Sequence, residues 1–157
     1  MPSDMIYTVS DLSRNRREVA DVARRGLARI RGTDGTGLVQ MPARRYEVLE
    51  AVSHWADRLG VVERSLTKSR AERTPADFGD LTWLRHFDED DLAEFVTELR
   101  QTLSLAYHDD DLASLVDAIA EWKATTDELT APARREVLLG SVDDADFVEV
   151  ARPERHR

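Results

Sequence analysis

Residues 27–42 of this 157-residue chain read LARIRGTDGTGLVQMP, and this stretch decides the fold of the first part of the sequence. Two short β-type runs, residues 27–31 and 37–41, flank a segment that holds Gly32 and Gly35. Glycine tolerates the backbone angles of a tight reversal, so the stretch predicts a β-hairpin. Pro42 is favoured at the first position of a helix, so a helix is expected to follow directly.

The residues on either side of the hairpin complete a small α+β unit. Residues 5–9, MIYTV, are rich in β-formers and predict a short strand. Ser10 predicts the cap of a helix that runs through Arg25, with Gly26 as its stop. The helix after Pro42 is expected to continue past Gly60 and to bury a stripe at three- and four-residue spacing, made of Tyr46, Leu49, Val52, Trp55 and Leu59. The predicted order is strand, helix, hairpin, helix.

The two halves of the chain carry opposite charge. Residues 1–75 hold 14 Lys and Arg against 10 Asp and Glu, a net of +4. Residues 76–157 hold 8 against 21, a net of −13, and the whole chain has a net charge of −9. The sign changes beside the Thr74-Pro75 punctuation, so a domain of residues 1–73 and an acidic region of residues 74–157 are predicted.

The acidic region is predicted to be mainly α-helical and to end in an extended segment. Acids at 88–91 and 109–111 each precede an amphipathic run, as expected where the helix macrodipole favours negative charge in the first turn. Residues 132–142 are weakly patterned. Residues 146–150, DFVEV, alternate like a strand or a docking segment, and a polar tail follows.

Three segments of the first half resemble the Phd/YefM family of bacterial antitoxins. They are YTVSDLSRN at 7–15, the run at 27–35, and GLVQMPARRYEVL at 37–49. The resemblance implies a small α+β homodimer whose N-terminal face binds operator DNA and represses its own operon. It also implies a C-terminal segment that wraps and inhibits a toxin encoded by the neighbouring gene. The chain departs from the family at Ser13, where an arginine is usual, and at Arg16, where an apolar residue is usual.

The first predicted helix carries the candidate DNA contacts. Arginines can lie along phosphates, and Asn15 has the amide geometry that pairs with adenine in a groove. With the positions that the resemblance adds, the DNA-binding candidates are Ser13, Arg14, Asn15, Arg16, Arg17 and Arg31. The alternative is that these arginines form a solvated helix face beside nearby acids.

The apolar residues of the acidic half have to be buried on one another, on the N-terminal domain or on a partner, because short isolated helices are marginal in water. A self-contained helical hairpin is one solution. In the antitoxin interpretation the partner is the toxin, and the net charge of −13 favours a basic one such as a ribonuclease. The toxin-binding candidates are then Trp83, Leu92, Phe95, Leu99, Leu112, Leu115, Ile119, Trp122 and Phe147.

Composition argues against several other classes of function. The chain has no cysteine, which removes thiolate catalysis and suits a reducing compartment, so a cytoplasmic protein is expected. The four histidines are scattered, and His108 stands beside acids that more often cap a helix, so no metal or cofactor is predicted. No nucleophile, base and orienting group stand together, so an enzyme is not expected.

The sequence thus predicts a cytoplasmic Phd/YefM-type antitoxin. Two alternatives remain at this point. One is a stand-alone transcriptional regulator with a folded helical C-terminal module, and the other is a protein–protein adaptor that does not touch DNA.

Overall fold

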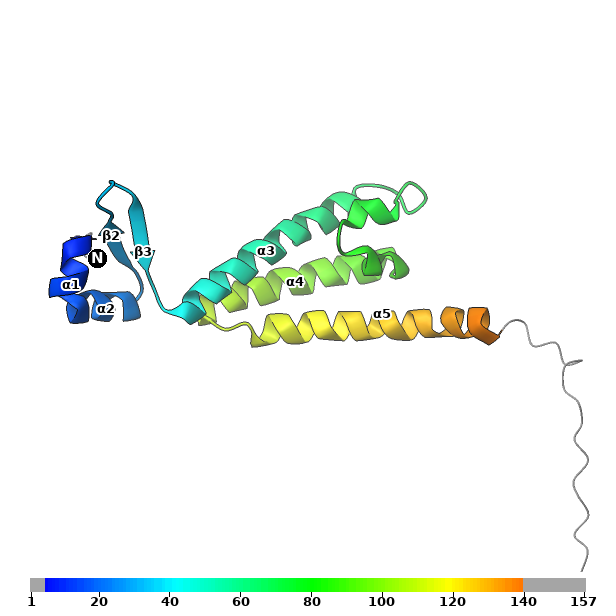
Figure 1. Ribbon diagram of the computed structural model, residues 1–157. Coiled ribbons are helices and arrows are strands. Elements are labelled where there is room, and N and C mark those ends of the chain that lie inside the picture. The colour runs from blue at the N-terminus through cyan, green and yellow to red at the C-terminus, as the bar shows by residue number, and fades with distance from the viewer. Residues whose placement is uncertain (1–4, 140–157) are drawn as a thin grey trace, which may run out of the picture.

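The computed structural model describes residues 5–139. Within this range the chain is α+β and mostly helical, with one three-stranded sheet and five α-helices. Figure 1 shows a small unit that holds the sheet and a longer unit built from three long helices, joined by a short connection.

The small unit has the predicted hairpin at its centre. Strand β2 pairs antiparallel with β3, and β1 lies on the other side of β2 and runs parallel to it. Tyr7, Ile30 and Leu38 are in register across the three strands. The elements in chain order are β1 (Ile6–Thr8), α1 (Val9–Arg14), α2 (Arg16–Arg24), β2 (Ala28–Arg31) and β3 (Gly37–Gln40).

The single helix expected over residues 10–25 is in fact two helices. The Asp11 carboxylate accepts hydrogen bonds from the Thr8 backbone N–H at 2.8 Å and from the Thr8 hydroxyl at 2.7 Å. This reciprocal cap starts α1 at Val9, so β1 ends one residue earlier than predicted. The helix then breaks at Asn15, whose φ of −122° and ψ of 30° are not helical. The break redirects the chain so that α2 can pack on the sheet.

The core of the small unit lies between α2 and one face of the sheet. Alternate strand residues point to this face, and they meet the apolar side of α2. The buried residues are Tyr7, Val19, Ala23, Ala28 and Ile30, with Leu12 and Val22 packed at the edge. Tyr7 also donates a hydrogen bond from its hydroxyl to Glu18 of α2 at 3.2 Å.

The long unit consists of α3 (Ala43–Leu66), α4 (Glu89–Asp109) and α5 (Ala113–Leu139), with two short 3₁₀ helices, η1 (Pro75–Phe78) and η2 (Thr82–His86), between α3 and α4. As predicted, α3 passes Gly60. Helix α4 lies between the other two and packs on both (Figure 1). Helix α5 continues through Pro132, where the sequence pattern is weak.

One hydrophobic core spans the long unit and crosses the boundary that charge suggested. Val62 of α3, Phe78 of η1, Leu84 of η2, Phe95 of α4 and Leu115 of α5 all belong to it. The predicted division near residue 74 therefore falls inside a single packed unit and is corrected here. The apolar stripe of α3 packs on α4 and not on the sheet, so the helix that follows the hairpin belongs to the core of the second half. The two units meet at Met41 and Pro42.

Four aromatic rings form the distal part of this core. Phe95 meets Trp83 at 5.8 Å and Trp122 at 5.4 Å between ring centroids, both edge to face. Phe87 meets Trp122 at 5.1 Å in the same way. The Trp122 indole N–H donates to Glu98 at 2.6 Å, so the one polar atom of this ring has a partner. Such pairs stabilise a core by about 0.5–1.5 kcal/mol each beyond area burial.

Truncating Phe95 tests this packing. Phe95 is 1% exposed, and Phe95→Ala is expected to lower the free energy of unfolding by about 3–5 kcal/mol because it leaves a cavity between two tryptophans. Val116→Ala, at a position 59% exposed, is the control and should change it by less than about 0.5 kcal/mol. Urea unfolding followed by tryptophan fluorescence measures both. Equal losses in the two variants would contradict the core described here.

Candidate nucleic-acid interface and acidic helical unit

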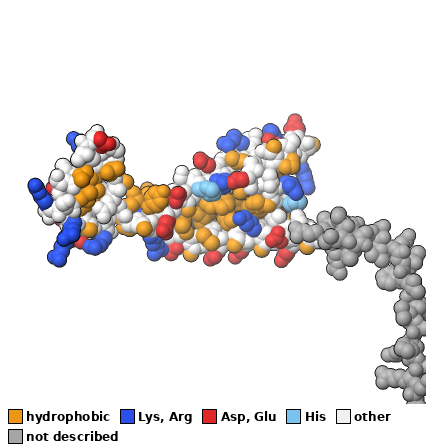
Figure 2. Space-filling view, in the orientation of Figure 1, with side chains coloured by type: hydrophobic (Ala, Val, Ile, Leu, Met, Phe, Trp, Pro, Cys, Tyr) orange, Lys and Arg blue, Asp and Glu red, His pale blue; other side chains and the backbone are white. Residues whose placement is uncertain are grey.

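The arginines predicted to contact DNA gather where α1 meets α2. Arg14 ends α1, Asn15 is the break, and Arg16 and Arg17 open α2. These side chains and Ser13 are all exposed. Figure 2 shows Lys and Arg side chains concentrated on the small unit, while Asp and Glu are spread over the long unit. The sequence has seven arginines against four acids over residues 5–41, a net of +3, and 12 basic against 21 acidic residues over 42–139, a net of −9.

The junction side chains are available to a ligand. Within residues 5–139, no hydrogen bond or ion pair occupies the side chains of Arg14, Arg16 or Arg17. The Asn15 side chain makes no capping bond to the start of α2, so its amide is also open. The Asp11 carboxylate accepts its hydrogen bonds from Thr8. The two hydrogen bonds from Thr8, backbone first, lower the pKa of Asp11.

Arg31 does not join this group. It lies in β2 next to Ile30, which is buried against α2, so its side chain leaves the sheet on the opposite face. The structure therefore brings five of the six candidate DNA contacts together and places the sixth elsewhere.

The face of the sheet that carries Arg31 is not covered by the described part of the chain. Ile6, Arg29 and Val39 are in register on this face. Ile6 is 50% exposed and Val39 is 59% exposed. Other apolar side chains of the small unit that remain exposed are Met5, Val9, Leu27 and Leu38. Sequence analysis missed this surface, although two consecutive apolar residues in β3, Leu38 and Val39, put an apolar side chain on each face of the sheet.

Eight of the nine residues predicted to anchor a toxin lie in or against the chain's own core, so they are not available to a toxin in this fold. Five of them are buried: Leu92, Phe95, Leu99, Leu115 and Ile119. Three are partly buried and pack against the same core: Trp83, Leu112 and Trp122. Phe147 lies outside the described residues. The apolar stripe of α3 supplies the packing surface that the acidic half was expected to seek in a partner.

The long unit thus presents a mainly polar surface with a few apolar side chains. Around the α4–α5 turn, Leu105 and Tyr107 of α4 and Val116 of α5 are 45–59% exposed. Acids surround this turn, because Asp109 ends α4 and Asp110 and Asp111 lie in the loop that follows.

Two arginines at the start of α3 bind the α4–α5 turn. Arg45 donates to the Tyr107 carbonyl at 2.8 Å and to Asp110 at 3.2 Å, and its guanidinium lies 4.5 Å from the centre of the Tyr107 ring. Arg44 donates to the Asp110 carbonyl at 2.6 Å and pairs with Asp111 at 2.9 Å. These bonds hold the beginning of α3 against the end of α4, next to the connection from the small unit. A shallow cavity of about 480 Å³ lies at this joint, between Arg25 and Leu27 on one side and Arg45 and Tyr107 on the other.

Two general observations limit the chemistry. No group of three or more His, Asp or Glu side chains within residues 5–139 is arranged to hold a metal ion. In the same range no helix is long and apolar enough to cross a membrane. Comparison with family profiles, curated proteins and solved structures gave no match for this chain.

Proposed function

We propose that this chain is an antitoxin of the Phd/YefM type that binds operator DNA as a homodimer. The observation that carries the proposal is the group of unpaired arginines around Asn15, displayed by a β-α-α-β-β-α unit whose order matches the resemblance. In this proposal the acidic long unit binds the toxin through its surface.

The DNA-binding part rests on the chemistry of the α1–α2 junction. Arg14, Arg16 and Arg17 are exposed and form no ion pair or side-chain hydrogen bond among the described residues, so phosphates can bind them without breaking one. Hydrogen bonds from Thr8 and, after them, the charge of Arg14 lower the pKa of Asp11, but the Asp11 carboxylate accepts its hydrogen bonds from Thr8. The Asn15 amide, which has no capping role, can donate to and accept from an adenine edge. Two copies related by a two-fold axis would present this group twice and suit a palindromic operator.

The dimer part rests on the open sheet face. A three-stranded sheet is stable when both faces are covered or one is polar, and here Ile6 and Val39 face solvent on the uncovered side. A second copy packed there would remove these side chains from water. It would also leave the α1–α2 junction free, because α2 lies on the other face.

The toxin-binding part rests on charge. The long unit has a net charge of −9 over residues 42–139 and is internally folded, so it can offer a preformed acidic surface. A basic toxin would associate rapidly with such a surface. The exposed apolar residues near the α4–α5 turn would supply the uncharged contacts.

Operator binding is expected to depend on the junction arginines. The double variant R14Q/R17Q removes four cations from a dimer, so the slope of log K against log salt should become less steep by about 3.6. Its charge-matched control is R64Q/K123Q, two exposed cations of the long unit that form no ion pair among the described residues. Fluorescence anisotropy with a promoter fragment from 50 to 300 mM salt measures both slopes. An unchanged slope in R14Q/R17Q would remove the DNA-binding assignment.

Dimerisation is expected to depend on Val39. Val39→Asp should shift the protein from dimer to monomer in sedimentation equilibrium, because it places a charge on the open sheet face beside Arg29 of β2. Val116→Asp is a matched control, since Val116 has the same 59% exposure on the long unit. If the dimer persists in V39D and dissociates in V116D, the dimer interface lies on the helices of the long unit and not on the sheet.

The buried state of the predicted toxin anchors favours a second candidate function. Leu92, Phe95 and Leu115 are buried in the core of the long unit, so this unit packs without a partner protein. It could therefore serve as the structural module of a stand-alone transcriptional regulator. This candidate shares the DNA and dimer surfaces with the first and differs only in having no toxin.

Co-expression separates the two candidates. The product of the neighbouring small open reading frame should arrest growth alone, be neutralised by this chain, and co-purify with it at 0.1 M salt. Because the contact is proposed to be electrostatic, the complex should weaken as salt rises towards 1 M. If no neighbouring product is toxic and none co-purifies, the regulator remains and the antitoxin proposal fails.

A further inference from the structure

The end of the long unit farthest from the small unit carries a second positive region. Between residues 64 and 86 the sequence has five basic residues against three acids, a net of +2 inside a unit whose net charge is −9. A small cavity of about 140 Å³ opens here between the loop after α3 and the two 3₁₀ helices. Its lining consists of Arg70, Arg73, Arg85, Thr74, Pro75, Phe78 and Phe87.

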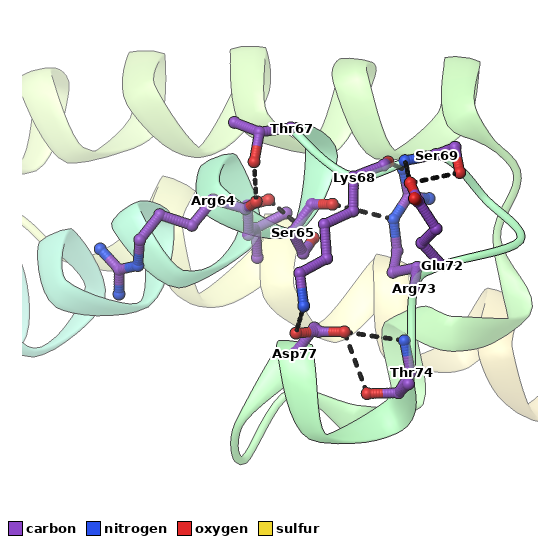
Figure 3. Close-up of polar contacts among 10 residues, drawn as sticks. Arg64, Ser65, Thr67, Lys68, Ser69, Glu72, Arg73, Thr74 and Asp77 are labelled. Atoms are coloured by element: carbon purple, nitrogen blue, oxygen red, sulfur yellow. Dashed lines mark hydrogen bonds and ion pairs between the residues drawn. The ribbon is translucent and has the colours of Figure 1, made fainter.

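Arg73 is built into this cavity. Its side chain is 6% exposed, and its Nε donates to the Ser65 carbonyl at 3.0 Å. Its Nη2 donates to the Lys68 carbonyl at 3.0 Å and pairs with Glu89 at 3.3 Å. These bonds fix the guanidinium plane, as Figure 3 shows in the loop after α3. Within the described residues no acceptor meets Nη1, so one edge of a fixed guanidinium is left for a ligand.

Two acids that follow α3, Glu72 and Asp77, already accept hydrogen bonds from neighbouring residues. Glu72 accepts from the Ser69 hydroxyl at 2.7 Å and from its backbone N–H at 3.2 Å, and these bonds lower its pKa. Asp77 accepts from Lys68 at 2.5 Å and from Thr74 (Figure 3). These bonds, Lys68 first, lower the pKa of Asp77 from 3.8 to about 2. Both carboxylates are therefore ionised caps near neutral pH, and neither turns to Arg70.

Arg70 and Arg85 are left without a counter-charge. Both are exposed, and neither side chain forms an ion pair or hydrogen bond within residues 5–139. With Arg73 they are three arginines that line one small cavity, and the one ion pair that any of them forms among the described residues is that of Arg73 with Glu89. Like charges at this density repel, and a bound anion would relieve that repulsion.

We infer that this cavity binds a phosphate-sized dianion, either free phosphate or the phosphate group of a small monoester. The guanidinium fork matches the geometry of a phosphate oxygen pair. The buried rings of Phe78 and Phe87 form apolar walls that strengthen such hydrogen bonds. A volume of about 140 Å³ is large enough for a phosphate group.

This site is separate from the proposed DNA contacts. It lies at the opposite end of the molecule from the α1–α2 junction, and it uses other residues (Figure 1). The inference therefore stands or falls independently of the antitoxin proposal.

Isothermal titration calorimetry on the full chain tests the site, with inorganic phosphate and glycerol phosphate as probes in a chloride buffer of constant ionic strength. We expect one phosphate per chain, and an affinity about tenfold weaker in R70Q and again in R85Q. R64Q removes an exposed charge from the same end of α3 without touching the cavity lining, so its affinity should equal that of the unchanged chain. Circular dichroism confirms that each variant is folded.

The two probes identify the source of the ligand. Tighter binding of glycerol phosphate supports a phosphorylated small molecule, and tighter binding of inorganic phosphate supports the free ion. Absence of a binding isotherm for both probes would overturn the inference. So would a loss of affinity in R64Q as large as that in R70Q and R85Q, because general charge attraction would then explain the binding.

Discussion

The packing of α3 on α4 is the interaction on which the rest of this structure depends. Helix α3 comes directly after the sheet, and its apolar side is buried by residues that lie beyond the charge boundary. Val62 of α3 is fully buried in the same core as Phe95 and Leu99 of α4. If α3 were removed, the acidic helices would expose their core residues to water. If the acidic helices were removed, α3 would expose its apolar stripe. The chain on the two sides of residue 74 therefore forms one folding unit.

Net charge and hydrophobic core are distributed unequally between the two units. The small unit has a net charge of +3 and the long unit a net charge of −9, and the two units meet at Met41 and Pro42. The large core lies entirely within the acidic long unit. The small unit keeps only a thin core against α2, and it leaves one face of its sheet open. The small unit therefore has an exposed apolar sheet face on one side and the exposed arginines of the α1–α2 junction on the other. This arrangement is the basis for the proposed dimer on DNA.

The polar contacts of the long unit lie mainly at its two ends. At the near end, Arg44 and Arg45 bind the α4–α5 turn, and their charges are balanced by Asp110 and Asp111. At the far end, Glu72 and Asp77 cap the loop that follows α3. Arg70 and Arg85 have no acid partner in the described chain, so the two ends differ in one physical respect. The arginine charges at the start of α3 are neutralised within the protein. Those of Arg70 and Arg85, at the other end of the long unit, are available to a ligand.

Local signals in the sequence were sufficient for much of the fold. The glycines of 27–42 indicated the hairpin, and the acids at 88–91 and 109–111 indicated helix starts within a few residues, because turn and capping preferences act over three or four positions. Arg14, Arg16 and Arg17 were expected at the surface, either against DNA or on a solvated helix face, and all three are exposed. The break at Asn15 was missed, because the packing of Val19 on the sheet competes with a continuous helix only once the strands are in place.

The sequence by itself determined that the chain has a basic α+β start and an acidic helical remainder, with apolar stripes that have to be buried. It could not determine what those stripes are buried against, because the periodicity of a helix reports which side is apolar and carries no information about its neighbour. Only the tertiary structure decided that α3 covers α4, that Leu92 and Phe95 are core residues, and that Arg70, Arg73 and Arg85 share one cavity. Each of these depends on contacts between residues far apart in the chain.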